Sequence, residues 1–202
     1  MIRAFLAVEL PDELRAQIAA VQQDLKQRLS RECSRDVRIS WVQPASIHLT
    51  VKFLGDTDES LVEPMRAALD RVAQGHRAMS IPLDRIGAFP RPQQPRIVWV
   101  GPAEAWEHGG DAVRLAALHR AVEDCCGTFG VSPEGRPLSP HLTLARIKEG
   151  ERVAGQALTN SGVMDRPVSV GSLDVRSIVL MKSDLRPTGS VYTKLWDVRL
   201  RA

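Results

Sequence analysis

Two short segments of the chain repeat the same arrangement of an imidazole and a hydroxyl. Ser46–Val51 reads SIHLTV and Ser139–Leu144 reads SPHLTL, so each copy places a threonine two residues after a histidine, with apolar residues at the alternate positions. With five histidines in 202 residues, two His-x-Thr spacings would meet by chance in about one sequence in eighty. The repeat therefore favours a shared chemical role for both copies.

Both segments have the alternation of a β-strand, in which neighbouring side chains point to opposite faces. His48 and Thr50 therefore share one face of their strand, and His141 and Thr143 share one face of theirs. The leucines between them are expected to enter the core. If two comparable lobes enclose one cleft, two imidazoles and two hydroxyls converge in it.

Such a set of groups can cleave a phosphodiester without a metal. An imidazole has a pKa of about 6.5, so one ring can be neutral and the other protonated at the same pH. The neutral ring takes a proton from the attacking water or hydroxyl, and the charged ring gives a proton to the departing oxygen. Thr50 and Thr143 can donate hydrogen bonds to the phosphate oxygens, where charge builds up in the transition state.

Two cations follow the motifs closely. Lys52 lies four residues after His48, and strict alternation places it on the His48 face, where we expect it to bind substrate. Arg146 follows Thr143, but the same alternation turns it away from that residue. Arg146 can therefore approach the motif residues only if the strand ends or twists between Thr143 and Arg146.

Other roles for these residues stay open at this point. A histidine in a strand can be purely structural, although two copies with the same flanks argue for function. A zinc site normally has three or four protein ligands, and neither motif has a histidine at i+4 or a neighbouring Asp, Glu or Cys. We therefore expect no metal. Cys125 falls on the apolar face of a predicted helix and is expected to pack rather than to act as a nucleophile.

Composition narrows the class of protein. A formal net charge of +3 is too small for a protein that coats nucleic acid, but it allows a local basic cleft. Three cysteines without a disulfide pattern indicate a reducing cytoplasm. The apolar start of the chain is followed at once by Asp12 and Glu13, unlike a secretion signal, and no apolar run approaches the length of a membrane span. We expect a cytoplasmic monomer with no membrane segment.

Strand and helix patterns alternate along the chain. We expect strands at 2–9, 37–42, 47–55, 78–90, 96–101, 140–148, 168–185 and 191–201. We expect helices at 11–29, from 58 onward, across 115–129 and near 150–160. Helices beside antiparallel sheets make an α+β fold, with residues 102–111 as a candidate linker between two lobes.

The doubled H-x-T-x pattern resembles the signature of the 2H phosphoesterase superfamily. Five stretches are similar to its RNA 2′,3′-cyclic phosphodiesterase branch, first named for 2′-5′ RNA ligase activity: RAFLAVELPDELR, W…IHLTVKFLG, FPRPQQPRIVWVG, GRPLSPHLTLAR and IVLMKSDLRPTGSVYTKLWDVRL. They follow one another in the family's order over almost the whole chain. The four motif residues show no departure from the pattern.

The resemblance implies an enzyme that opens the 2′,3′-cyclic phosphate at an RNA end to a 2′-phosphomonoester, with no metal and no cofactor. It implies that His48 is the proton donor to the leaving 3′-oxygen and that His141 is the proton acceptor that activates water. Thr50 and Thr143 would hold the phosphate, and Arg146 would reinforce them.

The resemblance also implies an architecture. Residues 1–202 would form a single 2H phosphoesterase domain made of two pseudo-symmetric lobes. Two concave antiparallel sheets, flanked by helices, would enclose a central active-site cleft.

An enzyme that acts on RNA ends can stack the terminal base on an aromatic ring. Phe53, Trp99 and Tyr192 are the candidates in this sequence. By alternation Phe53 faces the core, so we expect it to be structural, whereas Tyr192 lies beside a Gly-Ser turn and is the better candidate for substrate binding.

Other functions remain compatible with the sequence. The same site run in reverse would join a cyclic phosphate to a 5′-hydroxyl in a 2′-5′ linkage. It could also hydrolyse another cyclic or 2′-5′-linked nucleotide. A protein that binds RNA ends without catalysis would keep the threonines and cations but would have no need for two proton carriers.

Overall fold

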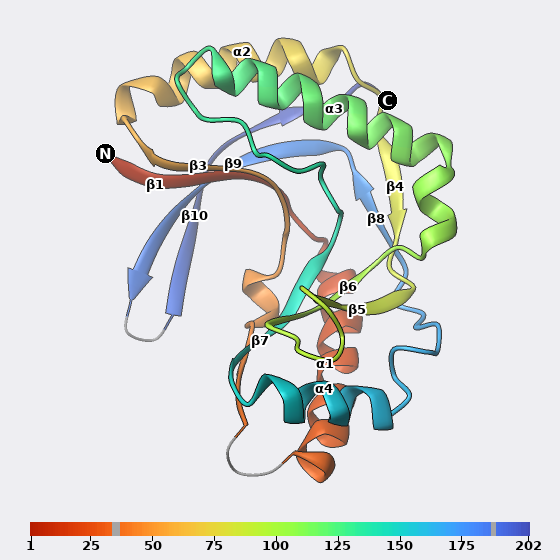
Figure 1. Ribbon diagram of the computed structural model, residues 1–202. Helices are drawn as coiled ribbons and strands as arrows, with labels where there is room; N and C mark the ends of the chain where they lie inside the picture. The colour runs from red at the N-terminus through yellow and green to blue at the C-terminus, as the bar shows by residue number, and fades with distance from the viewer. Residues whose placement is uncertain (34–36, 187–188) are drawn as a thin grey trace.

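The computed structural model describes residues 1–33, 37–186 and 189–202, and within these ranges it packs four α-helices against antiparallel β-sheets (Figure 1). The helices are α1 (Asp12–Glu32), α2 (Val62–Gln74), α3 (Gly110–Gly127) and α4 (Glu151–Asn160). The strands of the larger sheet are β1 (Ile2–Val8), β2 (Arg38–Trp41), β3 (Leu49–Thr57), β5 (Arg85–Phe89), β6 (Ile97–Gly101), β7 (Leu142–Glu149), β9 (Ser177–Arg186) and β10 (Gly189–Arg199). A smaller sheet pairs β4 (Met79–Pro82) with β8 (Ser172–Val175). The expected α+β fold with antiparallel sheets is confirmed.

The larger sheet has the order β10-β9-β1-β3-β7-β6-β5, with β2 also paired to β7. Its two central strands meet at a single residue pair, Leu49 and Leu142, which are the first residues of β3 and β7. Because the pairing is antiparallel, the two strands leave this point in opposite directions. We call β10, β9, β1 and β3 the first half of the sheet, and β7, β6, β5 and β2 the second half.

Each half is covered by its own helices. Helices α2 and α3 pack on each other and contact β10 and β3 of the first half, whereas α1 and α4 pack on each other and α4 contacts β7 of the second half (Figure 1). Helix α1 presents a buried stripe at helical spacing, made of Leu14, Ile18, Leu25 and Leu29. Since α1 follows β1 directly, the chain crosses between the halves, and neither half is one continuous segment.

The expected linker does run between the two halves. Residues 102–111 leave β6 of the second half, and Glu104–His108 forms a 3₁₀ turn that leads into α3, which covers the first half. The Trp106 indole donates to the Ser80 carbonyl oxygen, so this segment packs on β4. The two halves are interleaved along the sequence rather than successive.

Two predicted long strands are each divided. The strand expected at 78–90 is split into β4 and β5, which belong to different sheets. Leu83 and Asp84 lie between them, and the Asp84 carboxylate accepts a hydrogen bond from the Ala103 amide. The strand expected at 168–185 is split in the same way into β8 and β9, on either side of Arg176. Sequence pattern alone does not show a change of sheet within a continuous apolar run.

Both cysteines of α3 pack against the core, as expected for Cys125. Cys126 is fully buried, and Cys125 is partly buried. Burial raises the pKa of the Cys126 thiol to about 12, so it is protonated at neutral pH.

None of the helices in the described ranges is long and apolar enough to cross a membrane.

Candidate active site

The two motif strands have the same local structure. β3 and β7 show identical burial over their first eight positions, in which the third and fourth residues are both buried and the fifth is exposed. A regular strand would alternate at this point. Each strand therefore carries an irregularity that reverses which face its later side chains reach.

Pairing with the neighbouring strands locates these irregularities. In β3, Thr50 pairs with Ala7 and Lys52 pairs with Leu6, so Val51 is an extra residue. In β7, Thr143 and Ala145 pair with successive residues of β6, so Leu144 is extra in the same way. Each is a β-bulge three residues after the motif histidine.

Both imidazoles are fixed by the same hydrogen bond. Nδ1 of His48 lies 2.8 Å from the Ser46 carbonyl oxygen, and Nδ1 of His141 lies 2.8 Å from the Ser139 carbonyl oxygen. A carbonyl oxygen can only accept, so Nδ1 carries the proton in both rings. Nε2 is then the nitrogen of each ring that is available for proton transfer.

The register at the junction brings the motifs together. Continuing the antiparallel Leu49–Leu142 pair by one residue in each direction sets His48 opposite Thr143 and His141 opposite Thr50. Each imidazole therefore has a hydroxyl of the other half as its cross-strand neighbour. This is the convergence that the repeat in the sequence predicts.

Aromatic side chains hold the two rings from the sides. The Phe5 ring stacks on His48 with centroids 4.8 Å apart, and Tyr192 meets His48 edge-on at 5.2 Å. On the other side, Phe89 meets His141 edge-on at 5.0 Å. Phe5 and Phe89 were not among the residues singled out in the sequence, because β1 and β5 carry no motif that links them to the histidines.

These surroundings act on the protonation of both rings. Burial lowers the pKa of His48 below its usual range, the charge of Arg146 and the neighbouring His141 lower it further, and the hydrogen bond to Ser46 opposes them. Burial likewise lowers the pKa of His141, Arg146 adds to this, and the bond to Ser139 opposes it. These surroundings therefore favour the neutral form of both rings in the free protein.

Arg146 lies on the histidine side of the sheet. It is exposed, although strict alternation from Thr143 would turn it away, and its positive charge acts on both imidazoles. The bulge at Leu144 is the irregularity that the sequence argument required. The site thus has one arginine within electrostatic range of two histidines.

Lys52 does not share the His48 face, and this prediction is wrong. Its side chain is 0% exposed, and its Nζ lies 2.7 Å from a carboxylate oxygen of Glu123 on α3 and 3.1 Å from the Ser132 carbonyl oxygen. The bulge at Val51 turns the side chain to the helix-covered face. Lys52 is therefore paired inside the protein rather than offered to a substrate.

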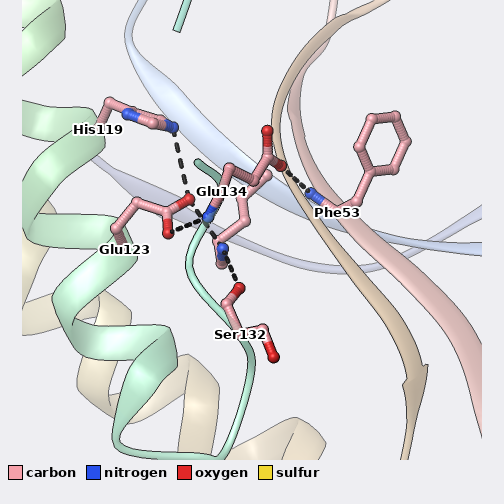
Figure 2. A network of polar contacts seen from close by, with 6 residues as sticks. Phe53, His119, Glu123, Ser132 and Glu134 are labelled. Atoms are coloured by element: carbon pink, nitrogen blue, oxygen red, sulfur yellow. Dashed lines mark hydrogen bonds and ion pairs between the residues drawn. The ribbon is translucent and has the colours of Figure 1, made fainter. Parts of the chain in front are cut away.

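The same contacts anchor the segment that leads to the second motif. Figure 2 shows Glu123, Ser132 and Glu134 gathered beside β3. The Glu134 amide donates to Glu123, and the Glu134 carboxylate accepts from the amide of Phe53. Beyond the junction, where β3 and β7 diverge, side chains and loop backbone thus take the place of a strand ladder.

Phe53 is also placed differently from the prediction. Its side chain is 62% exposed instead of buried, and Figure 2 shows the ring pointing away from the carboxylates. Phe53 pairs with Phe5, and their ring centroids lie 6.3 Å apart. It therefore faces the same side as His48, again because of the bulge at Val51.

A small pocket opens beside His48. Its volume is about 210 Å³, and it is lined by Glu9, Arg15, Ala45, Ser46, Ile47, His48, Met181, Tyr192 and Lys194. Tyr192, a sequence candidate, is thus part of the site, while the third aromatic candidate, Trp99, is buried beside His141 at 6.3 Å. Lys194, which the sequence analysis did not select, is held by Glu9 at 2.9 Å and Asp197 at 3.2 Å.

Among the residues that the structure describes, no group of three or more His, Cys, Asp or Glu side chains is arranged to hold a metal ion. The polar groups nearest to the two motif histidines include each other, Thr50, Thr143 and Arg146. Such a set can move protons and bind an oxyanion.

The chain is similar to a known family and to proteins of known name. The chain matches the family described as LigT like Phosphoesterase over residues 8–99 and 111–192. It is 33% identical to an RNA 2′,3′-cyclic phosphodiesterase of Methanothermobacter thermautotrophicus, over 98% of this chain and 99% of that protein. It is 35% identical to one of Thermus thermophilus, over 99% of this chain and 91% of that protein.

Solved structures share the fold over the full length. A crystal structure of a protein from Thermus thermophilus has a TM-score of 0.73 at 27% identity, covering 99% of this chain and 98% of that one. E. coli LigT, solved in complex with 3′-AMP, also has a TM-score of 0.73, at 23% identity, covering 100% of this chain and 99% of that one.

Proposed function

Because the chain belongs to the LigT-like phosphoesterase family, we propose that it hydrolyses 2′,3′-cyclic phosphate ends of RNA to 2′-phosphomonoesters. The observation that carries this proposal is the junction of the two halves, where His48 and His141 flank one residue pair with identical Nδ1 hydrogen bonds. The names of the relatives, RNA 2′,3′-cyclic phosphodiesterase, supply the substrate class.

In the proposed reaction, Nε2 of His141 takes a proton from a water molecule while the water oxygen forms a bond to phosphorus. The bond from phosphorus to the 3′-oxygen breaks, and protonated His48 gives its proton to that oxygen. The product carries a 2′-phosphate and a free 3′-hydroxyl. The two rings make the same Nδ1 hydrogen bond, so these bonds do not tell which ring is the donor and which is the acceptor. We assign the two roles by the family resemblance.

The phosphate would be held by both halves. Thr50 and Thr143 lie beside the imidazoles and can donate to its nonbridging oxygens, and Arg146 supplies a positive charge there. A bound phosphate anion favours the charged form of His48, which opposes the effect of burial on its pKa. Substrate binding would thus favour the charged, proton-donating form of His48, which burial disfavours.

The nucleoside would lie on the His48 side. Tyr192 lines the pocket of about 210 Å³, and Phe53 exposes its ring on the same side of the sheet. A base can stack on either ring whatever its sequence. On this proposal the first half binds the nucleoside, and the second half contributes the charge.

The proposal includes the organisation of the protein. Each half supplies one histidine and one threonine, so residues 1–202 would act as one domain of two related lobes, without a partner subunit. The chemistry needs only imidazoles, hydroxyls and a guanidinium, so it would proceed without a metal or a cofactor.

The test is turnover of a short RNA that ends in a 2′,3′-cyclic phosphate, in excess chelator. We expect His48→Ala and His141→Ala each to lower kcat by about 10²–10⁴-fold, the usual contribution of a general acid or base. His76→Ala, which changes a histidine outside the site, serves as the matched control and should keep wild-type turnover. Full activity in either motif variant, or activity only after metal is restored, would refute the proposal.

The same assay separates the alternatives. A 2′-5′ ligase would join the RNA to an added 5′-hydroxyl strand, although water at its ordinary concentration favours hydrolysis. A hydrolase of another cyclic or 2′-5′-linked nucleotide would leave the RNA end intact and cleave that compound. A binder without catalysis would retain affinity in His48→Ala and show no turnover in any variant.

A further inference from the structure

A second and larger pocket opens on the second half, at residues outside the candidate active site. Its volume is about 710 Å³, and it lies between the β5–β6 loop and the start of α4. The lining residues are Pro90, Arg91, Gln94, Arg96, Gly150, Glu151, Arg152 and Val153. No step of the proposed reaction uses any of them.

The walls of this pocket are built by the backbone. The Arg96 amide donates to the Phe89 carbonyl oxygen at 2.7 Å and closes the loop into a tight hairpin. Helix α4 packs so closely on this loop that a Cβ at Gly155 would collide with the carbonyl oxygens of Pro92 and Gln93. The packing of the loop on α4 therefore does not rely on the arginine side chains.

The charge of the pocket is strongly one-sided. Three arginines face one glutamate, which leaves a surplus of two positive charges. Glu151 approaches Arg96 only to 4.0 Å, and the Arg96 side chain remains 77% exposed. Arg91 donates to the amide oxygen of Gln94, which carries no charge. The guanidinium groups are thus incompletely neutralised by the protein.

The pocket adjoins the candidate active site. Phe89, the residue before Pro90, contacts the His141 ring, and Ile97, the residue after Arg96, pairs with Arg146. Both ends of the β5–β6 loop therefore begin at residues beside the histidine and the arginine of the second half. The β5–β6 loop therefore connects the candidate active site to the pocket along the chain.

We propose that this pocket binds backbone phosphates of the RNA that precedes the cyclic phosphate, so that the protein prefers an oligonucleotide end to a mononucleotide. Guanidinium forks match the geometry of phosphate oxygens, and phosphodiesters carry one negative charge for each nucleotide. The inference rests on the proposed function for the position of the RNA end. The pocket itself takes no part in bond breaking.

The experiment compares two substrates in one protein. Adenosine 2′,3′-cyclic phosphate offers the reacting group alone, and a four-nucleotide RNA with the same end adds three backbone phosphates. In the triple variant Arg91→Ala/Arg96→Ala/Arg152→Ala, we expect KM for the RNA to rise about tenfold or more, with kcat unchanged. KM for the mononucleotide should stay within about twofold of the wild type, because that substrate does not reach the pocket.

Salt dependence gives a second readout. Each contact to a single-stranded phosphate contributes about 0.7 to the slope of log affinity against log salt, so the triple variant should lose about 2 from that slope. The matched control, Arg66→Ala/Arg120→Ala/Arg176→Ala, removes the same charge from exposed sites elsewhere. It should leave the RNA preference intact.

Three outcomes would overturn the inference: an unchanged KM for the RNA, an equal rise for both substrates, or an equal effect of the control triple. If neither substrate is turned over, the proposed function fails instead. Fluorescence anisotropy of the labelled four-nucleotide RNA then measures RNA affinity directly and tests the role of the pocket without turnover. Weaker binding by the pocket triple than by the control triple supports the inference, and equal binding refutes it.

Discussion

The two halves of the sheet share the His-x-Thr motif and differ in the residues around it. His48 and His141 have the same carbonyl partner two residues earlier, and their strands have the same burial pattern and the same bulge. The fifth residue after the histidine is Phe53 in the first half and Arg146 in the second. The fourth is Lys52 in the first half and Ala145 in the second.

The two halves differ at the fourth and fifth residues after the histidine, which directly follow the bulge. Because it reverses the alternation, the fifth residue reaches the histidine face and the fourth is buried under the helices. One half thus exposes an aromatic ring there, and the other exposes a positive charge. Two related strands can supply equivalent acid and base groups while dividing nucleoside and phosphate binding between them.

Removal of the buried lysine should have the largest effect on folding. Lys52→Met leaves Glu123 mostly buried without its partner, which typically costs about 3–5 kcal/mol in the free energy of unfolding. Denaturant titration measures this cost. Lys148→Met, at an exposed position of β7, is the control and should change stability by about 0.5 kcal/mol or less.

The double variant Lys52→Met/Glu123→Leu should recover much of the loss, because it removes the unpaired charge as well. If Lys52→Met were no more destabilising than the surface control, the pairing of Lys52 inside the protein would be contradicted. The first half would then resemble the second more closely than the structure indicates.

Exchange of the fifth residues tests whether the halves are interchangeable. Arg146→Phe should lower kcat by about 10²–10³-fold, because it removes the charge beside the phosphate. Adding Phe53→Arg returns a guanidinium to the equivalent position of the first half and should restore about tenfold of the loss. Arg146→Phe with Phe53→Leu, which returns no charge, is the matched control.

A rescue by Phe53→Arg that does not exceed the rescue by Phe53→Leu would show that the two positions are not equivalent. The comparison would then hold for the histidines and their hydrogen bonds alone. Steady-state rates at saturating substrate separate this effect from a change in KM.

A smaller effect concerns stability and pH. Since folding lowers the pKa of both motif histidines, it favours their neutral form. Their contribution to stability is complete above the unfolded pKa of about 6.5 and is lost as pH falls through the lower folded values. Unfolding free energies measured across this range should fall less steeply for His48→Ala/His141→Ala than for the wild type.

His76→Ala is the reference for that measurement and should keep the wild-type slope. NMR titration of the imidazole protons reports the two pKa values separately. Values at or above about 6.5 for both rings would contradict the effect of burial and of Arg146.

The sequence alone predicts that the two His-x-Thr segments lie close together, and it predicts the main helices and strands, but it does not predict which face each later side chain of β3 and β7 reaches. The His-x-Thr repeat and the apolar stripe of α1 are local patterns, and both are found in the structure. The bulges depend on how β3 pairs with β1 and β7 with β6, and neither Val51 nor Leu144 differs from an ordinary strand residue. Simple alternation therefore misplaced Lys52 and Phe53.

For Arg146, two sequence arguments disagreed. Sequence resemblance assigned it to the phosphate, while alternation turned it away from Thr143. The structure places Arg146 on the histidine side because Leu144 is an extra residue in the strand pairing. Changes of sheet within a strand pattern, as at Asp84, escape prediction for a related reason, because they are set by contacts with distant segments.

The most direct test of the account is the identity of the product of the wild-type protein. ³¹P NMR of a single turnover on the cyclic-phosphate RNA, with chelator present, distinguishes a 2′-phosphomonoester from a 3′-phosphomonoester. The account predicts the 2′-phosphomonoester alone, because His48 gives its proton to the 3′-oxygen as that bond breaks. A 3′-phosphomonoester, or a mixture of the two, would contradict it.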